Sequence, residues 1–86
     1  MPKAFVLISV ETGSETDVLK RLKKVEGIVE AFLVYGIYDI IAQIKADSMD
    51  KLKETITLHV RRIDNVRSTL TMLIIESEAT TEEKRL

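Results

Sequence analysis

The sequence alternates segments of two different periodicities, and their order limits the folds open to the chain. Four segments are short and rich in valine, isoleucine and phenylalanine, as β-strands are, and two repeat apolar residues every three or four positions, as amphipathic helices do. The expected strands cover residues 3–10, 28–35, 39–46 and 66–76, and the expected helices cover residues 14–26 and 47–60. The order is strand, helix, strand, strand, helix, strand.

This order predicts an α+β fold, a ferredoxin-like βαββαβ sandwich in which a four-stranded antiparallel sheet carries two helices on one face. A chain of 86 residues can bury one small core, so we expect a single domain over residues 1–77. Residues 78–86, EATTEEKRL, are expected to be a charged tail with little to bury.

Three small residues mark the expected ends of the helices. Ser14 and Ser48 are placed to accept hydrogen bonds from the first-turn amides of the two helices. Gly27 follows the first helix and is a plausible left-handed cap.

Charge and cysteine content exclude several classes of partner. Lys and Arg total 13 against 14 Asp and Glu, so there is no basic field to attract nucleic acid or anionic lipid, and we expect no direct nucleic-acid partner and no membrane association. The sequence contains no cysteine, which excludes disulfides and thiolate metal sites and favours a reduced, cytoplasmic protein. We expect neither a metal nor a cofactor.

The strand segments are apolar on both faces. In residues 3–10, one face carries Ala4, Val6, Ile8 and Val10, and the other carries Phe5 and Leu7. A sheet with one solvated face would alternate apolar and polar residues instead. The helix-free face therefore predicts an obligate oligomer, at least a dimer. The alternative is a monomer whose second helix and tail cover more of the sheet.

The stretch LVYGIYDIIAQI, residues 33–44, carries candidate binding residues. Gly36 can adopt positive φ and let a ligand approach the backbone amides. Asp39 can accept hydrogen bonds from turn amides or from the ammonium group of a ligand. Thr69 and Thr71 share one face of the last strand and offer two hydroxyls. The set suits a zwitterionic amino acid. The alternative is that these residues serve only the hairpin and the strand.

His59 is the only histidine, and its spacing from Leu52 places it beside the buried stripe of the second helix, where packing is the expected role. A small dimeric ferredoxin-like enzyme using His59 or Asp39 as base is an alternative function. A general base needs a positioned acid or nucleophile that the spacing does not reveal, so we expect no enzyme activity. Tyr35 and Tyr38 lack the aromatic and basic strand pattern of RNA-binding domains.

Four motifs carry a resemblance to a known family. They are KAFVLISVETG at the start, Gly-x-Tyr-Asp at Gly36-Ile37-Tyr38-Asp39, DSMDKLKETI, and VRSTLTMLII at residues 66–75. In this order, the motifs resemble the effector-binding domain of the Lrp/AsnC family of transcriptional regulators, from about residue 3 to residue 76. Members normally carry an N-terminal helix-turn-helix domain, and this chain is similar to the stand-alone effector domains, the RAM domains (regulation of amino-acid metabolism).

The resemblance implies dimers whose sheets face each other, dimers that assemble into a ring such as an octamer or decamer, and an amino-acid effector in the cleft between dimers. It points to Gly36, Tyr38 and Asp39 as ligand-binding residues, with Thr69 and Thr71 near the cleft. Tyr35 departs from the family, which commonly has a small hydroxyl residue at this position.

Together these observations predict an amino-acid-sensing oligomer that modulates transcription regulators by ligand-linked assembly, alone or with full-length Lrp/AsnC proteins. A further alternative is a pure assembly module that binds no ligand. The bulky Tyr35 favours that alternative because its ring can fill part of the pocket.

Overall fold

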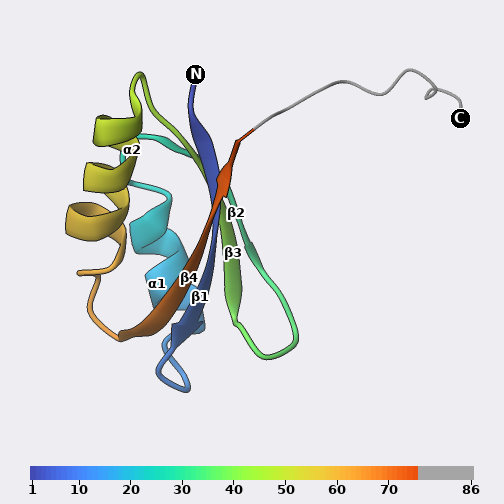
Figure 1. Cartoon of the computed structure of the whole chain (residues 1–86). Coiled ribbons are helices and arrows are strands. Elements are labelled where there is room, and N and C mark those ends of the chain that lie inside the picture. Colours follow the sequence, from blue (N-terminus) through green and yellow to red (C-terminus); the bar gives the residue numbers. More distant parts are fainter. Residues whose placement is uncertain (76–86) are drawn as a thin grey trace, which may run out of the picture.

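The computed structural model describes residues 1–75 and contains the elements in the predicted order (Figure 1). They are β1 (Lys3–Val10), α1 (Glu15–Leu22), β2 (Ile28–Leu33), β3 (Ile40–Lys45), α2 (Met49–Glu54), the π-helical segment η1 (Thr55–Val60) and β4 (Val66–Ile74). The predicted domain end at residue 77 and the predicted tail 78–86 lie outside the described residues.

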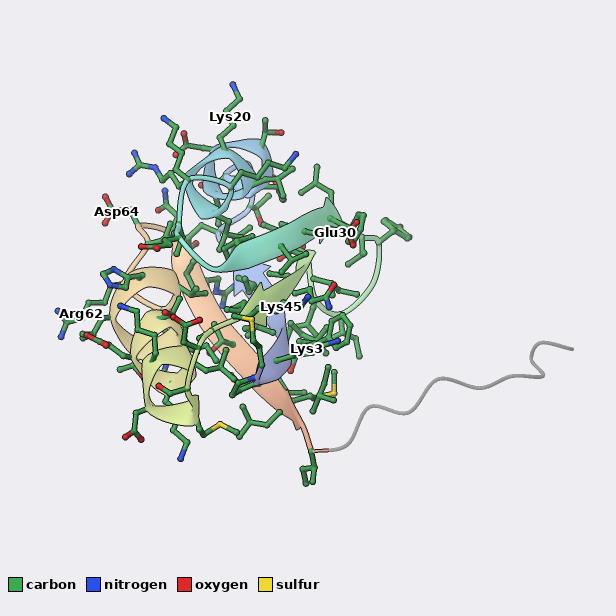
Figure 2. The ribbon with its side chains drawn as sticks, turned by 90° about the horizontal axis from the view of Figure 1, so that it is seen from above. Lys3, Lys20, Glu30, Lys45, Arg62 and Asp64 are labelled. Atoms are coloured by element: carbon green, nitrogen blue, oxygen red, sulfur yellow. The ribbon has the colours of Figure 1, made fainter. Side chains whose placement is uncertain are left out.

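The four strands form one antiparallel sheet in the order β2-β3-β1-β4, which confirms the ferredoxin-like prediction. Both helices cover the same face of the sheet, and the other face carries no helix (Figure 1). Figure 2 shows the same layering from above, with Lys20 and Arg62 pointing outward from the helix layer and Glu30 at the edge strand β2. No helix among the described residues has the length and apolar character needed to cross a membrane.

The core lies between the sheet and the helices. Its fully buried side chains come from every second position of the two central strands and from the inner faces of the helices: Ala4, Val6, Ile8, Ile40, Ala42, Ile44, Val18, Leu22, Leu52 and Val60. Burial of one such large aliphatic side chain contributes about 1.5–3 kcal/mol. Because the core occupies the helix side of the sheet, only the helix-free face of each strand is left for contacts with a partner.

The predicted helix caps have different outcomes. Ser48 has extended backbone angles, and its side chain accepts a hydrogen bond from the Lys51 amide at 3.1 Å, as predicted. The prediction for Ser14 is wrong: with φ −103° and ψ 5°, its side chain makes no capping bond, and the Glu15 carboxylate accepts from the Gly13 amide at 3.1 Å instead. Gly27 has φ +102°, which confirms its left-handed conformation, although α1 ends earlier, at residue 22.

The second helix widens after α2 into η1, where the Arg61 amide donates to the Ile56 carbonyl, five residues earlier, at 2.9 Å. Thr55 lies three residues after Leu52 on the inner side of the helix and is 2% exposed. His59 is exposed, so it does not have the packing role expected of it. Regular helical spacing places His59 on the same side of the helix as Leu52, and it does not allow for such a widened turn.

Candidate functional site

The connection between β2 and β3 is a six-residue loop, residues 34–39, rather than the predicted tight turn. The Val34 amide donates to the Asp39 carbonyl at 2.9 Å and closes the loop. Gly36 can adopt positive φ but does not do so in this loop. The longer loop spreads the chain reversal over more residues than a two-residue hairpin turn does, which removes the need for positive φ at Gly36.

The tip of this loop is apolar and exposed. Tyr35 and Ile37 project almost completely into solvent, while Tyr38 and Asp39 are half-buried at the base. Nothing packs within 4 Å of the position that a Cβ atom on Gly36 would occupy. Large exposed apolar side chains that lie together are typical of surfaces that contact a partner.

Asp39 joins the loop to β1. Its amide donates to the Ile8 carbonyl at 2.9 Å, and its carboxylate Oδ2 accepts from the Val10 amide, also at 2.9 Å. Because β3 begins only at Ile40, the carboxylate takes the place of a strand partner for Val10. Asp39 therefore accepts from an amide at the end of β1 rather than from an amide of its own turn, and its role toward a ligand stays a prediction.

The two threonines lie on the helix side of β4. Thr69 is paired with Ile8 and Thr71 with Val6, so both face the helix layer and share one face, as predicted. Val66 was expected on the opposite face. A bulge near Val10 shifts the register, so that Val66 pairs with Val10 and packs against the core on the same face as the threonines.

Thr69 is half-buried in a groove of about 290 Å³, whereas Thr71 is exposed. The groove is lined by Arg61, Val66, Arg67, Ser68 and Thr69, so it takes no residue from the 34–39 loop. Strand β1 lies between β3, which follows the loop, and β4. Strands β3 and β4 are therefore about 10 Å apart. Within one chain, the loop residues and the threonines therefore border β1 from opposite sides.

The helix-free face of the sheet carries a contiguous apolar patch, which we call the open face. Its members come from all four strands: Phe5, Leu7, Phe32, Ile41, Leu70 and Met72. They are linked by direct pairing, with Phe5 opposite Met72 and Leu7 opposite both Leu70 and Ile41. Each of these side chains remains at least partly exposed, which confirms the prediction that the strands are apolar on both faces.

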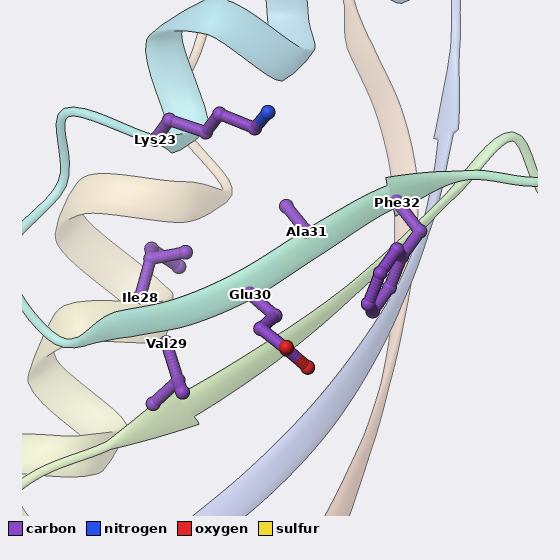
Figure 3. Close-up of a pocket in the computed structure, with 6 residues that line it drawn as sticks. All are labelled: Lys23, Ile28, Val29, Glu30, Ala31 and Phe32. Atoms are coloured by element: carbon purple, nitrogen blue, oxygen red, sulfur yellow. The ribbon is translucent and has the colours of Figure 1, made fainter.

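A further groove, of about 430 Å³, follows the edge strand β2 beside α1. Figure 3 shows Ile28 and Ala31 pointing toward the side of Lys23, while Val29, Glu30 and Phe32 point away from it. Val29 forms a bulge, because the pairing with β3 passes from Ile28 directly to Glu30. A bulge on an edge strand hinders pairing with a further strand.

The geometry offers little support for His59 as a general base or for a metal site. Within residues 1–75, His59 makes no side-chain hydrogen bond to an acid or a hydroxyl group. In the same part of the chain, no three His, Cys, Asp or Glu side chains are grouped so as to hold a metal ion.

The chain is similar in fold and in sequence to known proteins. The crystal structure of FFRP-DM1 is 33% identical and superposes with a TM-score of 0.84, over 87% of this chain and all of that chain. The HTH-type transcriptional regulator FL11 of Pyrococcus furiosus is 31% identical over 80 residues, which are 93% of this chain and 52% of the regulator. The chain thus spans about half the length of that curated relative.

Two other similarities are more limited. The homocitrate synthase of Saccharolobus islandicus is 36% identical over 73 residues, which are 81% of this chain but only 16% of the enzyme. The feast or famine regulatory protein Rv3291c of M. tuberculosis, solved in complex with L-methionine, is 23% identical with a TM-score of 0.73, over 93% of this chain and 54% of that chain. At this identity, the second similarity shows the fold alone.

The family model described as the Lrp/AsnC ligand binding domain matches residues 3–83. The match covers nearly the whole chain and includes the 34–39 loop, the open face and both threonines. The resemblance read from the sequence motifs is thereby confirmed. This chain belongs to the family of Lrp/AsnC ligand-binding domains.

Proposed function

We propose that this chain is a cytoplasmic, non-enzymatic sensor whose self-assembly responds to an amino acid. One observation carries the proposal: in a Lrp/AsnC ligand-binding domain, the 34–39 loop presents Tyr35 and Ile37 to solvent, just beyond the apolar open face. A loop of this kind is suited to contact a second copy of the chain. The L-methionine complex of Rv3291c supports an amino acid as the class of ligand.

The first step of assembly is a dimer formed by two open faces. Phe5, Phe32, Leu70 and Met72 are each between 37% and 52% exposed in the single chain, and a facing sheet would remove them from water. Each Å² of apolar surface buried in this way contributes about 25 cal/mol. A full-length Lrp/AsnC regulator carries the same domain, so it can pair with this chain through the same kind of apolar face.

The effector then binds where dimers meet in a ring, at the 34–39 loop. Gly36 leaves the backbone accessible, Tyr38 offers a hydroxyl, and Asp39 offers its second carboxylate oxygen to the effector's ammonium group. Thr69 and Thr71 lie on the other side of β1 from this loop. They contact the effector from the part of the cleft beside β4.

Ligand binding acts on assembly through linkage. An effector that binds the ring and not the separated dimers stabilises the ring by about 2.7 kcal/mol when its concentration is one hundred times Kd. This mechanism needs no cofactor, no bond-making step and no direct contact with nucleic acid or membrane.

The test separates the two possible roles of Asp39. Asp39→Asn keeps an oxygen that can accept from the Val10 amide but removes the charge offered to an ammonium group. We expect this variant to remain folded and to bind the effector about tenfold or more weakly by calorimetry. Asp50→Asn, at an exposed acid of α2, is the matched control and should bind normally. Equal affinity of both variants and the parent chain would remove Asp39 from the site.

A further inference from the structure

A furrow runs along the helix layer, between the end of α1 and the second helix. One part has a volume of about 290 Å³ and is lined by Lys24, Val25, Glu26, Lys51, Thr55 and His59. A neighbouring part of about 240 Å³ shares Glu26, Lys51 and Thr55 and also includes Gly27. We call the two parts together the helix furrow. None of these residues belongs to the open face or to the 34–39 loop.

Three lysines line the helix furrow, Lys24, Lys45 and Lys51, against two acids, Glu26 and Asp47. Lys51, Thr55 and His59 follow one another at intervals of four residues along one side of the second helix, and Lys24 stands on the opposite wall. Within residues 1–75, Lys24 forms no ion pair, and Lys51 is paired only with Glu54 at 3.9 Å. Both members of that pair are about half exposed, so little free energy holds Lys51 there.

Thr55 adds a buried hydroxyl without a partner. It lines both parts of the furrow and is 2% exposed, yet no side-chain hydrogen bond within the described residues involves its hydroxyl. Buried hydroxyls are almost always hydrogen-bonded, to protein, water or a ligand. The residue also begins the π-helical segment η1, and π-helical turns occur frequently at functional sites.

The opposite wall offers two backbone donors. The amides of Glu26 and Gly27 donate to no carbonyl within the described residues, although their neighbours Val25 and Ile28 both do. Gly27 has φ +102°, and successive amides around such a left-handed residue can form a concave site for an anion. Amide donors and ammonium groups thus border the same space.

We propose that the helix furrow binds a small anion that carries a carboxylate or phosphate group. Lys24, Lys51 and His59 hold the anionic group, and the Thr55 hydroxyl donates to it. Glu26 accepts from a hydroxyl group elsewhere on the ligand, which favours hydroxy acids and sugar phosphates. The two parts of the furrow, of about 290 and 240 Å³, are each below the usual volume range of ligand pockets, so the ligand is small. This site is separate from the effector cleft proposed above and does not depend on it.

The test is an NMR titration of the full chain with malate and, separately, with glycerol phosphate, at constant ionic strength. We expect saturable shifts of the amides of Glu26, Gly27, Thr55 and His59 with at least one probe. Saturation by one probe alone supports the site and assigns the carboxylate or the phosphate class. Saturation by neither probe, or shifts of equal size at lysines over the whole surface, would overturn the proposal.

Matched variants separate this site from general charge attraction. Lys51→Gln should weaken binding about tenfold, because an ammonium contact to the anion is lost. Lys53→Gln removes the same charge from the same helix outside the furrow and should leave affinity unchanged. Thr55→Val should weaken binding and Thr55→Ser should retain it. Equal losses in Lys51→Gln and Lys53→Gln would contradict the proposal even if the threonine variants do not fold.

Discussion

The Asp39 carboxylate accepts a hydrogen bond of 2.9 Å from the Val10 amide, across 29 positions of sequence. Val10 is 4% exposed, and β3 begins at Ile40, two residues after the position that would pair with Val10. The contact therefore fastens the base of the 34–39 loop to the end of β1. A residue of the candidate binding site also completes the hydrogen bonding of the sheet.

This contact predicts a difference between two substitutions at Asp39. Asp39→Ala leaves the buried Val10 amide without an acceptor and should lower the free energy of unfolding by about 1–3 kcal/mol. Asp39→Asn keeps an acceptor oxygen and should lose less. Urea denaturation at one fixed protein concentration measures both, with Asp64→Ala, at an exposed acid, as the control. Equal losses for Asp39→Ala and Asp64→Ala would show that the contact is not stabilising.

The two glycines Gly27 and Gly36 should respond differently to alanine. A Cβ atom on Gly27 would lie 2.9 Å from the Lys45 carbonyl oxygen, at φ +102°, so Gly27→Ala should destabilise by about 1–3 kcal/mol. Gly36 has open space around it and no positive φ, so Gly36→Ala should leave stability unchanged or raise it by about 0.4–1 kcal/mol. Thermal unfolding of the two variants side by side is the measurement, and a reversed order would contradict the assigned roles.

The open face predicts the effect of charge on assembly. Leu70→Lys places an ammonium group within the apolar patch, on β4 opposite Leu7, and should separate dimers into monomers. Leu58→Lys makes the same change at an exposed leucine of η1 and should leave the dimer intact. Sedimentation at micromolar concentration distinguishes them. Monomers in both variants, or in neither, would place the dimer contact elsewhere.

Replacement of Tyr35 should change ligand binding without changing the fold. Its side chain is fully exposed in the single chain, so Tyr35→Ser should alter the free energy of unfolding by less than about 0.5 kcal/mol. If the ring fills part of the effector cleft, its removal should raise effector affinity or widen the range of amino acids bound. Calorimetry on both proteins tests this, and lower affinity after the substitution would mean that the ring contributes to binding.

Much of the fold could be predicted from the sequence, because the strands and helices have clear periodicities. The bounds of β1, Lys3–Val10, agree with prediction because the apolar run is bounded by turn residues. The predicted end of β2 is two residues too late, because Val34 and Tyr35 extend the apolar pattern into a loop, and β3 is one residue shorter at each end than predicted. Ser14 and Ser48 look alike in sequence, but only Ser48 has the extended conformation that a capping side chain needs.

The remaining errors have a common physical cause. The π-helical turn at Thr55 and the bulge beside Val66 both interrupt a regular repeat, so residues fall on faces that strict periodicity does not assign to them. In the candidate site, alternation was enough to place Thr69 and Thr71 on one face. The contact of Asp39 with Val10 depends on where β3 starts relative to β1, and no local sequence pattern reports that.

The most direct test of the account is the native mass and the melting temperature of the chain, recorded with and without each standard amino acid in turn. The account predicts an oligomer whose melting temperature rises selectively with one amino acid or a few, together with a shift in assembly state. A monomer, or an oligomer indifferent to every amino acid, would contradict the proposed sensor. The indifferent oligomer would identify the chain as an assembly module.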